Sequence, residues 1–127
     1  MPLRLSLLPQ TYVIARLAAD APVPAGVLEA ADFVSVSRTA EELSIVCPQE
    51  VAPPAPKLDG GWRTLKLHGP FAFDEVGILA ALLAPLAEAG IGIFAVSTFD
   101  TDYLLVKATD LPRAMATLRG AGHSLVE

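Results

Sequence analysis

The sequence predicts an α+β fold, because residues 62–127 read as the order βαββαβ. Apolar and polar residues alternate in the first segment of this region, and apolar residues then recur at helical spacing in the second. Hydrophobic residues make up 53% of the 127 positions, which is enough to bury the core of one ordinary domain or of two very small ones.

This order begins with a strand and a helix. Residues 62–68 alternate as a strand does, and residues 76–90 place apolar side chains along one side of a helix. Asp74 can cap this helix, and Gly90 can end it. Pro85 removes one internal hydrogen bond, so we expect it to kink the helix or to reset its last turn.

Two strands, a second helix and a last strand complete the order. Residues 91–98 and 103–107 are rich in apolar and β-branched side chains and predict two strands around a polar turn. Residues 111–122 predict a helix, with Pro112 in its first turn, where a proline is tolerated. Residues 123–127 can form the last strand.

The first half of the chain predicts strands and little helix. Strands are expected at residues 12–18, 32–38 and 42–47, and only residues 23–30 can supply a helical turn or two. Residues 47–61 contain several prolines, which lack a backbone donor, and two adjacent glycines. That composition is typical of a linker or a long connecting loop.

An internal repeat relates the two halves. An ungapped shift of about sixty positions matches valines and serines of both segments and pairs Glu42 with Asp102. The first copy has nothing like the long apolar helix of the second. We therefore expect a shortened repeat over residues 1–58 and a complete domain over residues 59–127.

Charge and cysteine content exclude several classes of function. The net charge is −5 with no cluster of Lys or Arg, so we expect neither a nucleic acid nor a membrane as partner. The single cysteine, Cys47, rules out an internal disulfide and suits a reducing compartment. The amino terminus resembles neither a signal peptide nor a membrane span, so a soluble cytoplasmic protein is expected.

The candidates for catalysis are few. His68 and His123 are the only histidines, and no Ser/His/Asp order or metal-ligand spacing connects them with Cys47. We expect no catalytic residue, no metal and no cofactor, and hence no enzyme.

Three stretches within residues 73–106 carry a more specific pattern: a strand-to-helix glycine in DEVGI, a helix ending APLAEAGI, and the polar segment STFDTDYLLV. They resemble the amino-acid-binding ACT domains. The resemblance is strongest to small tandem ACT proteins, which are related to the ACT domains of the cytosolic arginine sensor. The resemblance implies a ferredoxin-like fold and a tandem ACT-like repeat with a shortened first copy. It also implies a regulatory role, with an amino acid or similar small molecule bound at an interface between ACT units.

A receptor for a free amino acid needs an anion site close to a cation site. The amino terminus of the first helix offers unpaired N–H groups, and Gly77 allows close approach to that backbone. Asp102 can accept hydrogen bonds from the ligand ammonium. The resemblance implies a ligand contact at Asp102, backbone contacts at Ala72, Gly77 and Ile78, and Phe99 as a side-chain neighbour.

Other interpretations remain open for these residues and for the chain. Asp102 could only tie down a hairpin, and Gly77 could only serve helix packing. The alternative function is a structural or interaction module with a vestigial ligand site. Ferredoxin-like folds also include acylphosphatases, but the arginine-bearing phosphate loop of such an enzyme is not visible.

Assembly is predicted from one strand. Residues 91–97 are apolar on both faces, whereas helices cover only one face of a ferredoxin-like sheet. We therefore expect the two halves to pair within the chain and the protein to form a homodimer as well. Because no enzyme or transporter domain is attached, any regulated protein is expected to be a separate partner.

Overall fold

The structure is a computed structural model, and the residues that it describes are 2–30, 32–69 and 76–126. Contacts between Cα atoms divide the chain into two compact units: unit 1 is Met1–Pro9 with Arg63–Glu127, and unit 2 is Gln10–Trp62. The boundary predicted between residues 58 and 59 stays a prediction. It was inferred from a sequence repeat, whereas the two compact units are defined by contacts between Cα atoms.

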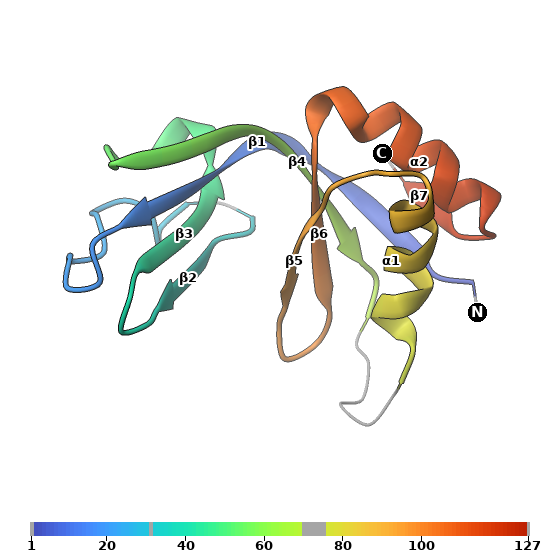
Figure 1. Ribbon diagram of the computed structural model, residues 1–127, viewed down its shortest axis with the longest axis horizontal. Helices are drawn as coiled ribbons and strands as arrows, with labels where there is room; N and C mark the ends of the chain where they lie inside the picture. Colours follow the sequence, from blue (N-terminus) through green and yellow to red (C-terminus); the bar gives the residue numbers. More distant parts are fainter. Residues whose placement is uncertain (1, 31, 70–75, 127) are drawn as a thin grey trace. The chain divides into compact units, whose positions relative to one another are not determined.

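The described residues confirm the α+β class (Figure 1). In chain order the elements are β1 (Arg4–Leu17), β2 (Ser35–Arg38), β3 (Leu43–Pro48), η1 (Gln49–Val51), β4 (Lys57–Leu67), α1 (Ile78–Glu88), β5 (Phe94–Ser97), β6 (Asp102–Lys107), η2 (Ala108–Asp110), α2 (Leu111–Gly120) and β7 (Ser124–Val126).

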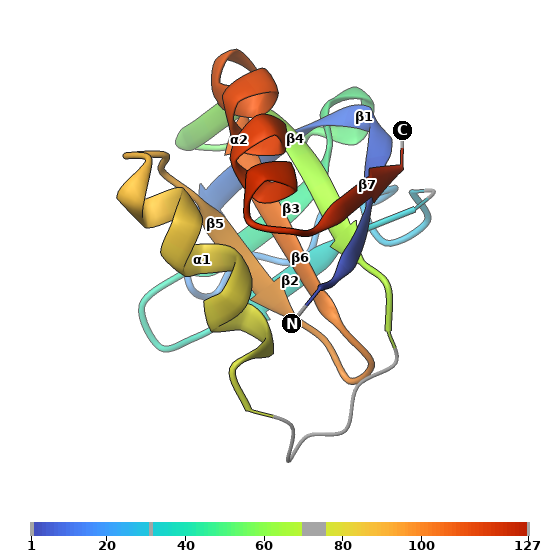
Figure 2. The ribbon, with the colours of Figure 1, turned by 90° about the vertical axis from the view of Figure 1, so that its right-hand side faces the viewer.

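Unit 1 contains both α-helices, which lie on the same face of its strands (Figure 2). From β4 onward the order is βαββαβ, as predicted. The strands lie in the order β7, β1, β4, β6, β5, and β1 pairs in parallel with β7 through Arg4 and Ser124. The amino-terminal segment of the chain therefore separates the first and last strands of the βαββαβ unit, which the sequence did not predict.

The core of unit 1 is the layer between the strands and the two helices. One cluster of buried side chains joins alternate residues of β4 and β6 with one side of each helix: Leu65, Leu67, Leu104, Val106, Ile78, Leu82, Leu86, Ala114, Met115 and Leu118. Full burial of each leucine stabilises the fold by about 1.5–3 kcal/mol. This packing confirms the periodicity from which the strand and the helix were predicted.

The carboxyl end of α1 is closed by a glycine, as predicted. Gly90 has a left-handed φ of 73°. Its N–H donates to the Ala87 carbonyl at 3.0 Å, and the N–H of Ile91 donates to the Leu86 carbonyl at 3.0 Å. This Schellman arrangement satisfies carbonyls that a helix end leaves unpaired. The helix is shorter than predicted at both ends, and the expected cap, Asp74, lies outside the described residues.

Pro85 lies inside α1, and the helix continues past it to Glu88. Because proline has no N–H, the carbonyl of Ala81 one turn earlier loses its helical donor. The Nε2 atom of His123 lies 3.1 Å from that carbonyl oxygen, and its Nδ1 atom accepts the N–H of Leu3 at 3.0 Å. In place of a helical N–H, a distant side chain therefore contacts the Ala81 carbonyl, and the predicted kink or reset of the last turn stays a prediction.

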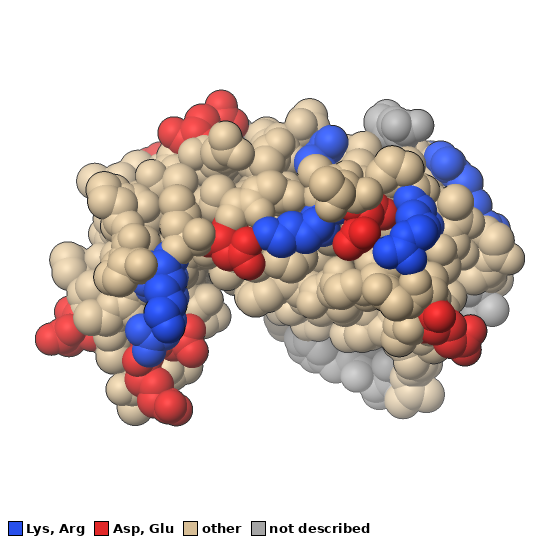
Figure 3. Space-filling view, turned by 45° about the horizontal axis from the view of Figure 1, so that its top comes forward, with Lys and Arg blue, Asp and Glu red and all other residues tan. Residues whose placement is uncertain are grey.

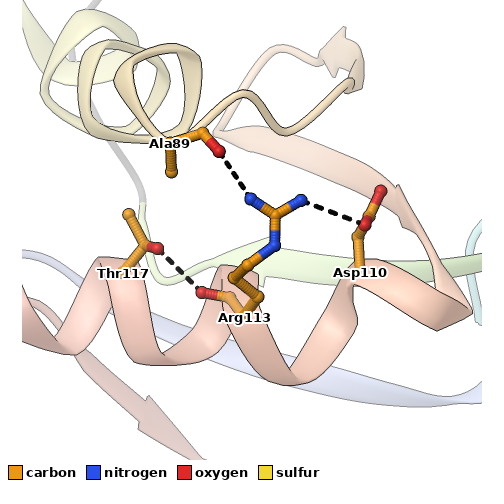
Figure 4. Close-up of polar contacts among 4 residues, drawn as sticks. All are labelled: Ala89, Asp110, Arg113 and Thr117. Atoms are coloured by element: carbon orange, nitrogen blue, oxygen red, sulfur yellow. Dashed lines mark hydrogen bonds and ion pairs between the residues drawn. The ribbon is translucent and has the colours of Figure 1, made fainter.

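Arg113 connects the two helices (Figure 4). Its Nη1 group donates to the carbonyl of Ala89, the residue that ends α1, and its Nη2 group lies 3.3 Å from Asp110 Oδ1. The Thr117 hydroxyl donates to the Arg113 carbonyl at 2.8 Å one turn along α2. A cation at the carboxyl end of α1 also complements the negative end of the helix dipole.

Unit 2 uses the strand order β2, β3, β1, β4. The antiparallel register pairs Tyr12 with Pro48 and Leu17 with Leu43, and β2 pairs with β3 from Ser35 opposite Val46. The 3-10 helix η1 follows this β2–β3 hairpin, as η2 follows the β5–β6 hairpin in unit 1. The described part of unit 2 contains no α-helix.

The helical turn predicted at residues 23–30 is wrong. This segment forms turns, in which the N–H of Val27 donates to the Pro24 carbonyl at 3.4 Å. Pro24 has no N–H, and Gly26 has a left-handed φ of 88°, so the local backbone departs from a helix. The side chain of Val27 is nevertheless buried in the core of unit 2, so the turns cover strands where a helix was expected.

Two other predictions for the first half need correction. Strand β1 begins at Arg4, not at residue 12, because its early residues pair with β7. Strand β4 begins at Lys57, so residues 57–61 are not a linker. A Cβ atom on Gly60 would lie 3.5 Å from the Val13 Cγ1 atom, which is an ordinary van der Waals contact, so packing against Val13 does not require a glycine there.

Candidate functional site

The polar turn between β5 and β6 is held by its own threonines. The N–H of Thr98 donates to the Thr101 carbonyl at 2.8 Å, and the N–H of Thr101 donates back to the Thr98 hydroxyl at 3.3 Å. Thr101 is only 8% exposed, and its hydroxyl donates to the carbonyl of Leu67 at 2.7 Å. These bonds fix the turn against the end of β4.

Asp102 lies directly after this turn, at the start of β6. It is paired with Ser97 across the β5–β6 ladder, and the Ser97 hydroxyl donates to its Oδ1 atom. Leu104 and Val106, which follow at alternate positions, are buried beneath the helices. Because side chains alternate along a strand, the half-buried Asp102 lies on the helix-covered face.

The start of α1 is built around Gly77. This residue is the N-cap and has a left-handed φ of 80°, and its carbonyl accepts the N–H of Ala81 at 3.0 Å. The cap supplies no side-chain hydrogen bond. The Ile78 side chain is buried in the core, so only its backbone could contact a ligand. Ala72 lies outside the described residues.

The two views place the β5–β6 turn and the start of α1 at the same end of unit 1 (Figures 1 and 2). The predicted site residues Asp102 and Phe99 come from the hairpin, and Gly77 and Ile78 come from the helix. The helix start carries the positive end of the helix dipole, and Asp102 carries a negative charge. The two elements can therefore offer the complementary charges that a zwitterion needs.

A pocket of about 350 Å³ lies beside this turn, and its described lining residues are Lys66, Gly69, Thr98, Phe99, Asp100, Thr101 and Tyr103. Phe99 is thus a lining residue, whereas Asp102 is not among them. Sequence reasoning missed Lys66 and Tyr103. Strand alternation could have identified them, because Lys66 lies between two leucines that face the helices and Tyr103 precedes a third.

The groups considered for catalysis have other surroundings. Both ring nitrogens of the buried His123 are occupied by backbone groups, and the Nε2 atom of His68 contacts the Ser6 hydroxyl. Cys47 is buried, and this burial raises the pKa of its thiol, which keeps the sulfur in its less reactive neutral form. In the described ranges, no three His, Cys, Asp or Glu side chains form a group that could hold a metal.

Charges of both signs are mixed on the face drawn in Figure 3. Neither helix in the described part of the chain combines the length and hydrophobicity needed to cross a bilayer.

The fold and the site define the class of protein as a ferredoxin-like α+β domain with a polar hairpin beside a helix start. The chain belongs to the ACT domain family, whose model matches residues 57–120. A second family model, described only as an N-terminal domain, matches residues 10–55.

Three relatives show how far this similarity extends. The crystal structure of protein Atu0741 from Agobacterium tumefaciens is 47% identical, covers 99% of this chain and 93% of its own, and has a TM-score of 0.91. The regulatory subunit of aspartate kinase from Thermus thermophilus is 12% identical, covers 92% and 95%, and has a TM-score of 0.66, so it supports the fold alone. The human cytosolic arginine sensor for mTORC1 subunit 1 is 46% identical over 46 residues. That match covers 35% of this chain and only 14% of the sensor.

Proposed function

We propose that this chain is a small regulatory ACT protein that binds a free amino acid at an interface between ACT units. The observation that carries the proposal is the position of Asp102, on the helix-covered face of β6 and at the same end of unit 1 as the start of α1. The partial match to an arginine sensor supports the same class of ligand.

Each proposed contact has a physical role. The ligand carboxylate binds at the first N–H groups of α1, where Gly77 has no side chain to obstruct it. The ligand ammonium donates to Asp102. Phe99, which is 78% exposed, covers part of the ligand, and the backbone of Ile78 contacts it.

Isothermal titration of the full chain against each of the twenty proteinogenic amino acids tests this proposal. Saturable binding of one or a few of them, with arginine as the first candidate, is the expected result. Absence of heat for all twenty, with the folded protein at concentrations suited to micromolar to millimolar affinity, would contradict it.

A structural or interaction module with a vestigial site is the second candidate. The hydrogen bond from Ser97 to Asp102 favours it, because the carboxylate then has a role within the hairpin. In that case Asp102 would matter for stability and no amino acid would bind.

We also propose that the chain forms a homodimer that supplies the facing ACT unit. Strand β5 lies at the end of the strand order in unit 1, and its Phe94 and Val96 side chains are half-buried. A second copy could cover this edge and its apolar side chains. Light scattering should give the mass of two chains at micromolar concentration, and a monomer both with and without amino acids would contradict the dimer.

The proposed setting is the cytoplasm, where the amino-acid signal would pass to a separate regulated protein. The acidic net charge and the mixed charges of Figure 3 support a small-molecule or protein partner over nucleic acid and membrane.

A further inference from the structure

We propose that one end of the unit 1 sheet binds an acidic segment of a separate protein through Arg4 and Lys66. Both helices lie on one face of this sheet (Figure 2). The residues on either side of these two cations are buried beneath the helices: Leu3, Leu5, Leu65 and Leu67. Because side chains alternate along a strand, Arg4 and Lys66 project from the opposite face. The inference goes beyond the proposed function and does not require an amino acid to bind.

The fold brings these two cations together from distant parts of the sequence. The N–H of His68 donates to the Arg4 carbonyl at 2.8 Å, so these two residues lie opposite one another. Lys66, two positions before His68, is then a diagonal neighbour of Arg4, at a typical separation of about 7–8 Å. The Ser6 hydroxyl contacts the His68 ring, and Ser124 pairs with Arg4, so both serines lie on the same face. We call these five residues the basic surface.

The fold does not use the two cations of the basic surface. The side chains of Arg4 and Lys66 are exposed, and neither makes an ion pair or a hydrogen bond with a residue that the structure describes. Four other arginines instead donate to backbone carbonyls: Arg16, Arg38, Arg63 and Arg113. A partner can therefore engage Arg4 and Lys66 without breaking a contact within the described part of unit 1.

Carboxylates are segregated from this face of the sheet. Asp102 is the only acidic residue in the described strands of unit 1, and it lies on the helix-covered face. Asp100, in the β5–β6 turn, lines a pocket together with Lys66 and so bounds the basic surface on one side. A chain with a net charge of −5 thus presents a local excess of positive charge, which complements an acidic partner.

Apolar side chains beside the cations favour a protein segment over other polyanions. Val126, which pairs with Ser6, exposes 39% of its surface, and the half-buried Tyr103 lies on the same face because it precedes the buried Leu104. Nucleic acid is disfavoured, because the basic surface has two arginine or lysine side chains and the net charge of the whole chain repels a polyanion. A second copy would present the same cations, so like charges oppose a symmetric contact between two such surfaces.

The probe for this inference is a short fluorescent peptide rich in glutamate and leucine, titrated with the full chain at low salt and followed by fluorescence anisotropy. Saturable binding that weakens as salt is added is expected. The same peptide with glutamine in place of every glutamate should bind at least about tenfold more weakly. Amide NMR with the unlabelled glutamate peptide should show shifts at the basic surface.

Charge variants give the second arm of the test. Arg4→Met and Lys66→Met should each weaken binding of the glutamate peptide by about threefold, and the double variant by about tenfold. Asp100→Asn should strengthen binding, because it removes a like charge beside Lys66. Arg119→Met and Lys57→Met remove exposed cations elsewhere and should leave the affinity unchanged. Melting curves of all five variants check that each one is folded.

Four results would overturn the inference: no saturable binding of the glutamate peptide up to about 1 mM at low salt; equal binding of the glutamine peptide; unchanged affinity in the folded double variant; or tighter binding of single-stranded DNA of the same charge, which would assign the surface to nucleic acid. Shifts confined to residues 77–80 would place the peptide at the site of the proposed function and would also count against the basic surface.

Discussion

The His123 side chain contacts the carbonyl oxygen of Ala81. This oxygen has no hydrogen-bond donor within the helix, because residue 85 is a proline and lacks an N–H. The imidazole Nε2 atom lies 3.1 Å from this oxygen, while Nδ1 accepts the N–H of Leu3. The neutral Nε2–H tautomer satisfies both bonds, since one ring nitrogen must donate and the other must accept. A single buried side chain thereby joins the end of α2, the middle of α1 and the start of the chain.

We predict that His123→Ala lowers the free energy of unfolding by about 2–4 kcal/mol, because it leaves one buried donor and one buried acceptor unpaired and opens a cavity. In the Pro85→Ala background the loss should be smaller by about 1 kcal/mol, since residue 85 then supplies an N–H to Ala81. Denaturant unfolding of the four proteins in this cycle measures the difference.

His68→Ala is the matched control for that cycle. The His68 side chain is exposed and should change stability by no more than about 0.5 kcal/mol. An equal loss for His123→Ala with and without Pro85 would show that the imidazole does not compensate for the proline.

Asp102→Ala is predicted to weaken ligand binding without lowering the stability of the fold. If its carboxylate meets the ligand ammonium, the substitution should cost on the order of 2–5 kcal/mol of binding, so affinity should fall at least about tenfold. The melting temperature without ligand should stay level or rise slightly, because one acidic group is removed near Asp100. Melting curves with and without a saturating ligand measure both effects.

Ser97→Ala is the control for Asp102. It removes the hydroxyl that donates to the carboxylate and keeps the carboxylate itself. Ligand binding should persist in this variant. If the ligand-induced shift in melting temperature survives Asp102→Ala unchanged, the assignment of Asp102 to the site is wrong.

Gly77→Ala should destabilise the protein by about 1–2 kcal/mol, the usual cost of a left-handed backbone for a residue with a Cβ atom. Among the described residues other than its chain neighbours, none has an atom within 4 Å of the Cβ position, so we expect the cost to come from backbone conformation. Gly92→Ala has equal space and no positive φ and should be neutral or slightly stabilising. Thermal unfolding of both variants compares them, and equal effects would contradict this explanation.

Arg113→Met should cost about 1 kcal/mol, because the exposed guanidinium contributes one hydrogen bond to the end of α1 and a weak ion pair with Asp110. Amide hydrogen exchange should accelerate most at Gly90 and Ile91, which close the same helix end. Arg119→Met removes an equal charge from α2 and serves as the control. Uniform acceleration of amide exchange across unit 1 would contradict a local effect of Arg113 on the end of α1.

Cys47 should react with a thiol reagent far more slowly in the folded protein than in denaturant. Burial limits access and raises the pKa of the thiol. Since the unfolded thiol ionises more readily, this group stabilises the fold fully below its unfolded pKa, near 8.5, and the contribution declines as pH rises above that value. Reaction rates and unfolding free energies between about pH 7 and 10 test both statements. Equal reaction rates in the folded and unfolded protein would contradict the burial.

The sequence was sufficient where local pattern and long-range packing agree. The apolar spacing of α1, the glycine that ends it and the alternation around Leu65 predicted elements that the structure contains, because one-sided burial imposes a periodicity that the chain itself displays. The sequence was not sufficient at residues 23–30, where a helical turn or two was predicted although Pro24 and Gly26 produce turns.

The residues of the candidate site stay a prediction. The helix start indicated Gly77, the polar segment indicated Asp102, and the resemblance to ACT domains implied Phe99, and the proposal rests on these residues. The pocket that contains Lys66 and Tyr103 was not foreseen, because its walls come from β4 and from a turn some thirty residues later, and no local periodicity encodes which turn meets which strand.

By itself, the sequence determined the α+β class, the βαββαβ order and the helix end at Gly90, since each follows from residue types within one short segment. Only the tertiary structure decided that the first strand separates β4 from β7 and that His123 compensates for Pro85. In both cases, backbone groups that are unpaired in one segment are satisfied by a segment more than thirty residues away. The free energy of the whole fold selects such a pairing.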